Sequence, residues 1–274
     1  MTVDELLVFA NSHIHKDHAR ILLAEIIEKN PLELLSYLDE IVSEEKVELY
    51  KKAVLALEEG KPLQYIMQHI NFYGLDFYID ERVLIPRFET EELVENTIKY
   101  NERNFKEPIE IIDLGCGSGV IGLTLEKKVS TKTVDLVDIS KDALEVTNKN
   151  CGELNSHANI IESDFFEKID KQYDVIISNP PYIMNNEEIE QIVKDNEPHL
   201  ALYAGEDGLD SYRKILSTIK THMKDRCLVA FEIGYKQAEE IVKLININLE
   251  NVKIEIKKDL SGKDRMIFIL KNIE

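Results

Sequence analysis

Residues 1 to about 70 carry apolar side chains at the spacing of an α-helix. These positions include Leu6, Leu7, Phe9, Ala10, Ile21, Leu22, Ile26 and Ile27, which recur three or four residues apart. Asn30-Pro31 predicts that a further helix begins at Pro31, and Gly60-Lys61-Pro62 predicts the end of another. Because no strand-like alternation occurs here, we predict a small helical bundle.

Residues 72–88 change to the alternation that is expected of strands. Phe77 and Ile79 alternate with more polar neighbours, and Val83-Leu84-Ile85 follows three polar residues. We predict a β-hairpin here that links two domains. The expected organisation is an N-terminal helical domain, a hairpin linker and a larger domain, at residues 1–71, 72–88 and 89–274.

From about residue 108 the pattern alternates between apolar runs typical of strands and amphipathic stretches typical of helices. The predicted strands are 109–112, 133–137, 159–161, 173–178, 227–233, 252–256 and 266–270. The last two are joined through Ser261-Gly262 with no helix between them. This order predicts an α/β fold with a mostly parallel, Rossmann-like sheet covered by helices and an antiparallel C-terminal edge strand.

The composition indicates where in the cell the protein resides and whether it carries a metal site. Hydrophobic residues make up 44% of the 274 residues, and no apolar run approaches the length of a membrane span. The N-terminus lacks the basic start and apolar stretch of a secretory signal. The three cysteines lie far apart, and His13, His15 and His18 spread around their helix. We expect a reduced, cytoplasmic protein with no metal site and no membrane contact.

The chain is acidic along its whole length. Its formal net charge is −19, and residues 1–75 hold 7 Lys and Arg against 13 Asp and Glu, which is −6 and leaves −13 for the rest. Neither part offers an obvious counter-charge for a phosphate backbone. We therefore expect no direct nucleic-acid partner, and the long-range field favours a basic one.

A glycine-rich loop follows the first predicted strand of the larger domain. Its sequence is Asp113-Leu114-Gly115-Cys116-Gly117-Ser118-Gly119. The glycines permit tight turns and close approach to a ligand, and the N-terminus of the following helix favours an anionic group such as a carboxylate. Gly117 to Gly122 also matches G-x-G-x-x-G, the dinucleotide-binding pattern. Asp113 favours a methyltransferase, because a carboxylate accepts a cofactor's ammonium group but repels a pyrophosphate.

Further candidate cofactor residues follow the next two strands. Asp138 ends the second strand, where its carboxylate can accept both hydroxyls of a ribose. Asp164 and Phe165 follow the third strand. Phe165 offers a wall for an adenine ring, and Asp164 offers an acceptor for its exocyclic amine. A core aromatic beside a solvated acid is an equally good interpretation of this pair.

Asn179-Pro180-Pro181-Tyr182 follows the fourth strand and carries the clearest chemistry. Ligands of open α/β sheets bind outside the carboxyl ends of the strands, so this loop is expected to share a mouth with the glycine loop. An amide nitrogen reacts only when its N–H groups are held, because its lone pair is delocalised. The Asn179 side-chain oxygen and the Pro180 carbonyl offer two acceptors, the prolines fix the backbone, and Tyr182 can stack on the flat amide. Positioning of the amide nitrogen against an already activated methyl group would account for most of the rate acceleration, so we assign no general base.

With these motifs and their flanking segments, the chain resembles the protein-glutamine N5-methyltransferases that modify peptide-chain release factors. The resemblance covers nearly the whole chain. Besides the glycine loop and Asn179 to Tyr182, the matching segments are Pro62–Ile66, Leu84–Arg87, Glu89–Glu91, Glu197–Pro198, Leu200–Leu202, Gly205–Leu209 and Asp259–Arg265. Asn-Pro-Pro-Tyr alone is shared with DNA and RNA amino-methyltransferases, whereas the flanking set is more specific.

The resemblance implies a class I methyltransferase fold that uses S-adenosyl-L-methionine, preceded by a helical domain that helps to dock the substrate. It implies a class 1 release factor as partner and the glutamine of its Gly-Gly-Gln loop as methyl acceptor. By motif match the cofactor residues are Gly115, Cys116, Gly117, Ser118, Gly119, Asp138, Phe165 and Asn179. The substrate amide would lie against Asn179, Pro180, Pro181 and Tyr182. We expect a monomer.

Several alternatives stay open. Phe88 and Phe165 stand where relatives often carry a proline and a tryptophan, and the second difference changes only the size of the adenine wall. A sister group that methylates a ribosomal-protein glutamine shares most of the motifs. A DNA or RNA amino-methyltransferase and a catalytically silent cofactor-binding scaffold are further hypotheses. Arg87 either contacts the substrate or holds the hairpin, and Glu232 either approaches the cleft or is structural.

Overall fold

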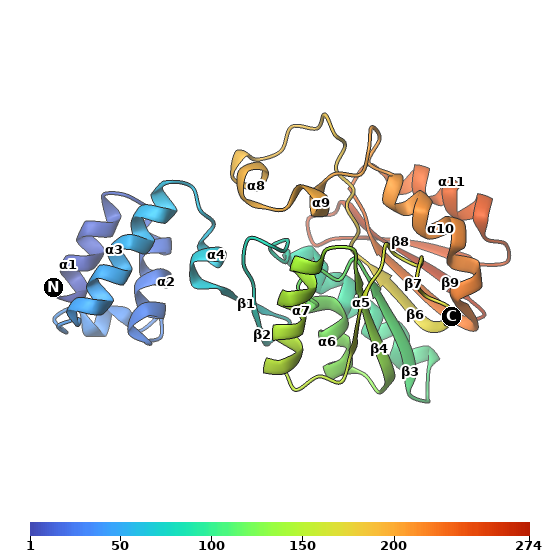
Figure 1. Cartoon of the computed structure of the whole chain (residues 1–274), viewed down its shortest axis with the longest axis horizontal. Coiled ribbons are helices and arrows are strands. Elements are labelled where there is room, and N and C mark those ends of the chain that lie inside the picture. Colours follow the sequence, from blue (N-terminus) through green and yellow to red (C-terminus); the bar gives the residue numbers. More distant parts are fainter. The chain divides into compact units, whose positions relative to one another are not determined.

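The computed structural model describes residues 1–274, and the chain divides into two units. Unit 1 comprises residues 1–70 and 190–196, and unit 2 comprises residues 71–189 and 197–274. Figure 1 shows the helices and strands of each unit along the chain. No helix is both long enough and apolar enough to cross a membrane.

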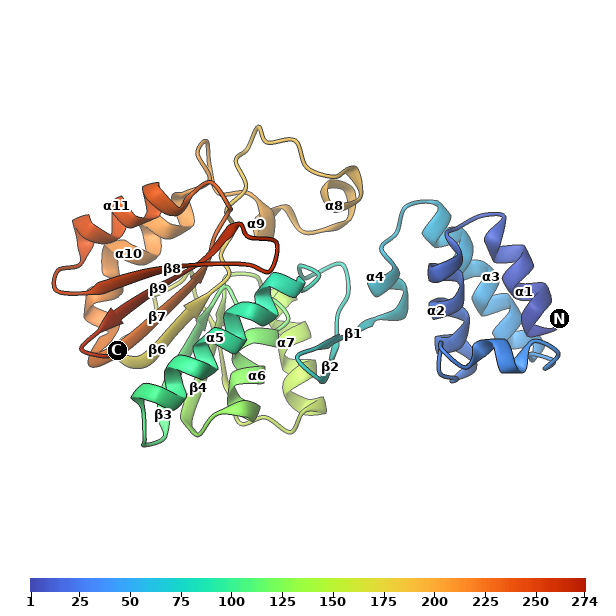
Figure 2. The ribbon, with the colours of Figure 1, turned by 180° about the vertical axis from the view of Figure 1, so that it is seen from behind.

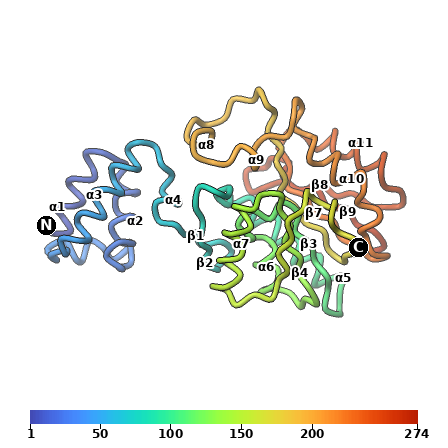
Figure 3. Tube along the Cα trace, viewed as in Figure 1, coloured from blue at the N-terminus to red at the C-terminus, as the bar shows by residue number.

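Unit 1 is the helical bundle that the apolar spacing predicts. Its elements are α1 (Val3–Asn11), α2 (Lys16–Ile27), the 3-10 helix η1 (Leu34–Tyr37), α3 (Glu44–Glu58), α4 (Leu63–Met67) and α8 (Gln191–Asn196), which can be followed in Figure 3. Leu6, Leu22 and Tyr50 are among its fully buried core residues, and the Tyr50 hydroxyl donates to the Ala19 carbonyl at 3.0 Å. Asn196 of α8 donates its side-chain amide to the Gly60 carbonyl at 3.1 Å, which ties this later segment to the bundle.

The prediction of a helix that begins at Pro31 is wrong. Residues 31–33 form a turn, and only the four-residue η1 follows. The Asn30 side-chain oxygen accepts the Leu32 N–H at 2.9 Å. This local hydrogen bond offers the backbone an alternative to the helix at this point.

The predicted hairpin is present but lies earlier in the chain. Its strands are β1 (His69–Phe72) and β2 (Leu75–Tyr78). They are joined by Tyr73 and Gly74, which both have a positive φ, of 51° and 79°. Two consecutive left-handed residues are typical of the two-residue turns that join antiparallel strands.

The predicted strand at Val83-Leu84-Ile85 is wrong. These residues are not part of any sheet. The Asp80 carboxylate accepts the backbone N–H of Arg82 at 3.1 Å and its guanidinium Nε at 2.9 Å. This closed turn redirects the chain directly after β2, and Val83 and Leu84 line a cavity instead.

Unit 2 contains a seven-stranded sheet in the order β5-β4-β3-β6-β7-β9-β8. Its strands are β3 (Ile109–Leu114), β4 (Thr131–Asp138), β5 (Asn159–Glu162), β6 (Tyr173–Ser178), β7 (Met223–Glu232), β8 (Lys253–Lys258) and β9 (Asp264–Lys271). Strands β3 to β7 pair in parallel, whereas β9 runs antiparallel to both of its neighbours. The mostly parallel sheet and its antiparallel edge are confirmed; β8 occupies the edge, and the last strand of the chain lies inside it.

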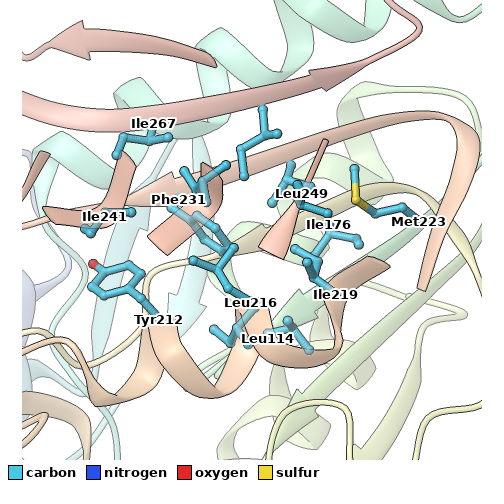
Figure 4. Close-up of a cluster of buried hydrophobic side chains, with 14 of the residues drawn as sticks. Leu114, Ile176, Tyr212, Leu216, Ile219, Met223, Phe231, Ile241, Leu249 and Ile267 are labelled. Atoms are coloured by element: carbon cyan, nitrogen blue, oxygen red, sulfur yellow. The ribbon is translucent and has the colours of Figure 1, made fainter. Parts of the chain in front are cut away.

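Helices cover both faces of this sheet (Figures 1 and 2). They are α10 (Asp210–His222) and α11 (Ala238–Asn248) on one face and α5 (Phe88–Asn104), α6 (Val120–Lys128) and α7 (Lys141–Glu153) on the other, with the short α9 (His199–Leu202) in the connection that follows β6. Figure 4 shows Leu216 and Ile219 of α10 among the buried side chains of the strands, such as Ile176. Because side chains alternate along β3, Leu114 joins this cluster while Asp113 turns to α6.

Candidate active site

A cavity of about 320 Å³ opens in unit 2 at the carboxyl ends of β3, β4 and β6. Its walls come from the glycine loop, the loops after β4, β5 and β6, the segment that precedes and begins α5, and residues 198–211. Ligands of open α/β sheets bind at this edge, because the loops there can vary while the strands stay fixed. The cavity therefore gathers the motifs that the sequence places after successive strands.

The glycine loop presents its backbone to the cavity. Gly115, Gly117 and Gly119 have positive φ values of 71°, 57° and 82°, a region that suits glycine. Gly115, Cys116, Gly117 and Ser118 line the cavity, whereas Gly119 is buried behind it. A Cβ at Gly119 would lie only 3.1 Å from the side chains of Leu123 and Thr147. Gly115 and Gly117 therefore line the cavity with bare backbone, whereas Gly119 packs against the side chains behind it.

Asp138 closes the cavity beside this loop. One of its carboxylate oxygens accepts the Gly117 N–H and the other accepts the Ser140 N–H, each at 2.9 Å. Burial raises the pKa of this carboxyl, although both hydrogen bonds oppose the change. Asp138 thus fixes the glycine loop while it lines the cavity, and each oxygen keeps a second lone pair for a ligand hydroxyl.

Asp113 does not line the cavity. Its side chain is fully buried, and one carboxylate oxygen accepts the Gly122 N–H at 2.9 Å. The other oxygen has no hydrogen-bond partner. Burial raises the pKa of Asp113 to about 7. The structure therefore places this carboxyl behind the glycine loop, where it holds the first turn of α6.

Asp164 and Phe165 both line the cavity. Phe165 has a positive φ of 49°, which is uncommon for an aromatic residue and is found at sites where the surroundings dictate the backbone. Its ring would touch a Cβ placed on Gly115, at 4.0 Å. The Asp164 carboxylate pairs with Lys214 of α10. An aromatic wall and a partly neutralised acid therefore stand next to the glycine loop.

The loop after β6 contributes Asn179 and Pro181 to the cavity wall. Pro180 is buried, and Tyr182 is half-buried against the apolar cluster under α10; neither lines the cavity. The Tyr182 carbonyl accepts the side-chain amide of Gln237 at 2.9 Å, which anchors the end of this loop. The structure thus brings Asn179 to the cavity and leaves Tyr182 as part of its support.

Asn179 is held by a residue that the sequence analysis did not single out. Its side-chain nitrogen donates to the Thr90 hydroxyl at 3.3 Å. That hydroxyl donates in turn to the Glu232 carboxylate at 2.7 Å. Thr90 and Glu232 are both buried, at 3% and 1% exposed. Glu232 is therefore connected to Asn179 through hydrogen bonds of Thr90.

Arg87 connects two segments of unit 2 that are far apart in the sequence. It pairs with Glu197, whose second oxygen accepts the Ile85 N–H at 3.1 Å. This contact joins two segments that both line the cavity, through Pro86 and Pro198. The flanking motifs contained these residues, but only contacts between positions more than a hundred residues apart reveal what they do.

Two family models match parts of this chain. Residues 5–67 match the family model described as the PrmC N-terminal domain, and residues 91–201 match the Methyltransferase small domain. A Bacillus subtilis release factor glutamine methyltransferase is 37% identical over 98% of this chain and 98% of its own, and a Bacillus cereus protein of the same name is 34% identical over 98% and 99%. The crystal structure of a methyltransferase from Pyrococcus furiosus has a TM-score of 0.55 at 16% identity, over 73% of this chain and 91% of its own, which shows the fold.

Proposed function

The chain belongs to the release factor glutamine methyltransferases, and from this premise we propose that it methylates the side-chain nitrogen of the Gly-Gly-Gln glutamine in a class 1 release factor, with S-adenosyl-L-methionine as methyl donor. The observation that carries the proposal is the position of Asn179. Its amide lies at the cavity wall that it shares with the glycine loop and is held there by Thr90. A planar amide acceptor and a nucleoside cofactor would meet at this point.

The cavity residues fit S-adenosyl-L-methionine. Bound there, the cofactor would supply a methyl group on a positively charged sulfur. A bond would form between the glutamine nitrogen and the methyl carbon as the bond between that carbon and the sulfur breaks. The backbone of Gly115 to Ser118 would lie along it, because these residues line the cavity and a Cβ on Gly117 would meet no other atom within 4 Å, which leaves room for a ligand. Asp138 would accept the ribose hydroxyls. Phe165 and Asp164 would receive the adenine.

The substrate amide would lie against the loop after β6. The Asn179 side-chain oxygen and the Pro180 carbonyl would accept its two N–H groups, which turns the nitrogen lone pair toward the methyl group. Pro181 fixes the backbone beside them, and Tyr182 supports the loop through the core. The nitrogen loses one proton to water after transfer, so no strong base is needed in the cavity.

We propose that unit 1 helps to dock the release factor and that the enzyme acts as a monomer. The net charge of −19 supports a basic protein surface as partner and opposes a phosphate backbone. This charge also argues against a DNA or RNA amino-methyltransferase, which shares the Asn179 to Tyr182 motif.

Methyl transfer to a release factor tests the proposal directly. The protein is incubated with labelled S-adenosyl-L-methionine and either a wild-type release factor or its Gly-Gly-Gln Gln→Ala variant. We expect label on the glutamine of the first and none on the second, as located by peptide mass spectrometry. An oligonucleotide and a ribosomal-protein substrate serve as comparison arms. Absence of label under conditions in which the Bacillus subtilis relative is active would contradict the proposed function.

A further inference from the structure

We propose that Thr90 and Glu232 are positioning residues that choose the orientation of the Asn179 side-chain amide, so that its oxygen faces the substrate. The inference rests on the proposed function only for the identity of the methyl acceptor. It starts from the three-residue chain of hydrogen bonds that joins Glu232 to Thr90 and Thr90 to Asn179. The three residues come from β7, from α5 and from the loop after β6.

The direction of this chain follows from the number of protons. A threonine hydroxyl has one proton to donate and two lone pairs to offer. A carboxylate oxygen is an acceptor only, so the Thr90 proton is used by Glu232 at 2.7 Å. The hydroxyl can then only accept from Asn179, at 3.3 Å. The nitrogen of the Asn179 amide therefore faces Thr90, and its oxygen lies on the opposite side of the amide group.

This choice matters because the two ends of the amide have opposite effects on a glutamine. An oxygen accepts a substrate N–H and helps to turn the nitrogen lone pair toward the methyl group. An NH₂ group in the same place would repel those N–H groups. Because Thr90 and Glu232 are both buried, water does not compete for the hydrogen bond between them. Preorganised polar groups of this kind contribute most when they need not reorient during the reaction.

Protonation of Glu232 would remove the preference for one orientation of the Asn179 amide. A neutral carboxyl can donate to Thr90, whose proton is then free for the Asn179 oxygen. Burial raises the pKa of Glu232 to about 7, while its bond to Thr90 and the charge of Arg265 oppose the change. The other groups that face Glu232 are Glu89 and Arg87 at the start of α5, Tyr182 after β6 and Tyr212 of α10. The Asn179 amide is thus held in its active orientation at a pH above the pKa of Glu232, and it is free to turn at a pH below that pKa.

Thr90→Val tests the first step, because it keeps the shape of the side chain and removes the hydroxyl. We expect kcat to fall by about tenfold, which is the scale of one lost hydrogen bond, while the KM for S-adenosyl-L-methionine stays within about twofold. Thr90→Ser should restore most of kcat. Thr97→Val is the matched control: Thr97 lies on the same helix, is 1% exposed and donates only to the Leu93 carbonyl. It should leave kcat unchanged.

Glu232→Gln tests the second step through the pH profile. The wild-type kcat should rise through about pH 7, and the variant should lose this limb, because a glutamine side chain does not titrate. Calorimetric binding of S-adenosyl-L-homocysteine should be equal in all variants, which shows that the cavity is intact. An unchanged kcat in Thr90→Val, or the same acid limb in Glu232→Gln, would overturn the inference. A wild-type enzyme that does not label the release factor would overturn the proposed function instead.

Discussion

The two loops that follow β3 and β6 both line the cavity, but they are held by different means. The loop after β3 is fixed by contacts close in sequence: Gly117 to Asp138 spans 21 positions, and Asp113 to Gly122 spans 9. The loop after β6 is fixed by contacts with residues that are distant in the sequence. Asn179 reaches Thr90 across 89 positions, and Thr90 reaches Glu232 across 142.

This difference separates two kinds of site. The first loop presents backbone atoms to the cavity, so a substitution that adds a side chain should impair it. The second loop presents a side-chain amide, so a substitution that removes this amide or changes its orientation should impair it. A short motif suffices to encode the first, whereas the second needs partners that only the folded sheet brings together.

Removal of the Asn179 amide should have the largest effect. We expect Asn179→Ala to lower the rate of methyl transfer by about two orders of magnitude or more, as when one preorganised hydrogen-bonding group is lost from an active site. Its thermal stability should stay near that of the wild type. Single-turnover transfer to a release factor measures the loss, with Asn246→Ala on the exposed side of α11 as the control. A rate near normal would refute the role of Asn179.

An added methyl group on the glycine loop should have an intermediate effect. Gly117→Ala places a Cβ in open cavity space at a φ of 57°, so we expect about tenfold weaker binding of S-adenosyl-L-methionine and about 1 kcal/mol less stability. Calorimetry and urea unfolding measure the two quantities. Gly74→Ala is the matched control, because Gly74 also has a positive φ, of 79°, and open surroundings but lies in the exposed hairpin turn. It should lose stability and keep its affinity; equal affinities in both variants would mean that the loop does not contact the ligand.

Loss of the ion pair between Lys214 and Asp164 should have the smallest effect. Lys214 is 41% exposed and Asp164 is 28% exposed, so water screens their attraction. We expect Lys214→Met to change stability by less than about 1 kcal/mol and cofactor affinity by less than about threefold. The same two measurements apply. A tenfold change in affinity would show that Asp164 must be held by Lys214 in order to meet the ligand, and the loop after β5 would then also depend on a distant partner.

The fold was largely predictable because periodicity reports which face of an element is buried. The helices of unit 1 and all seven strands of the sheet follow this pattern. The errors at Pro31 and at Val83 to Ile85 have a common cause. In each case a side-chain oxygen, of Asn30 or of Asp80, accepts a nearby backbone N–H and closes a turn that apolar spacing does not report.

The sequence by itself determined the α/β sheet, the family and the presence of an acid–glycine loop and an Asn-Pro-Pro-Tyr loop at the same edge. Strand order along the chain and short motifs are sufficient for these, because parallel strands end at one edge of a sheet. Only the tertiary structure decided that Asp113 lies behind the cavity and that Thr90 connects Glu232 to Asn179. Burial and hydrogen bonding depend on neighbours from distant parts of the chain, and these neighbours meet only when α5, β6 and β7 pack together.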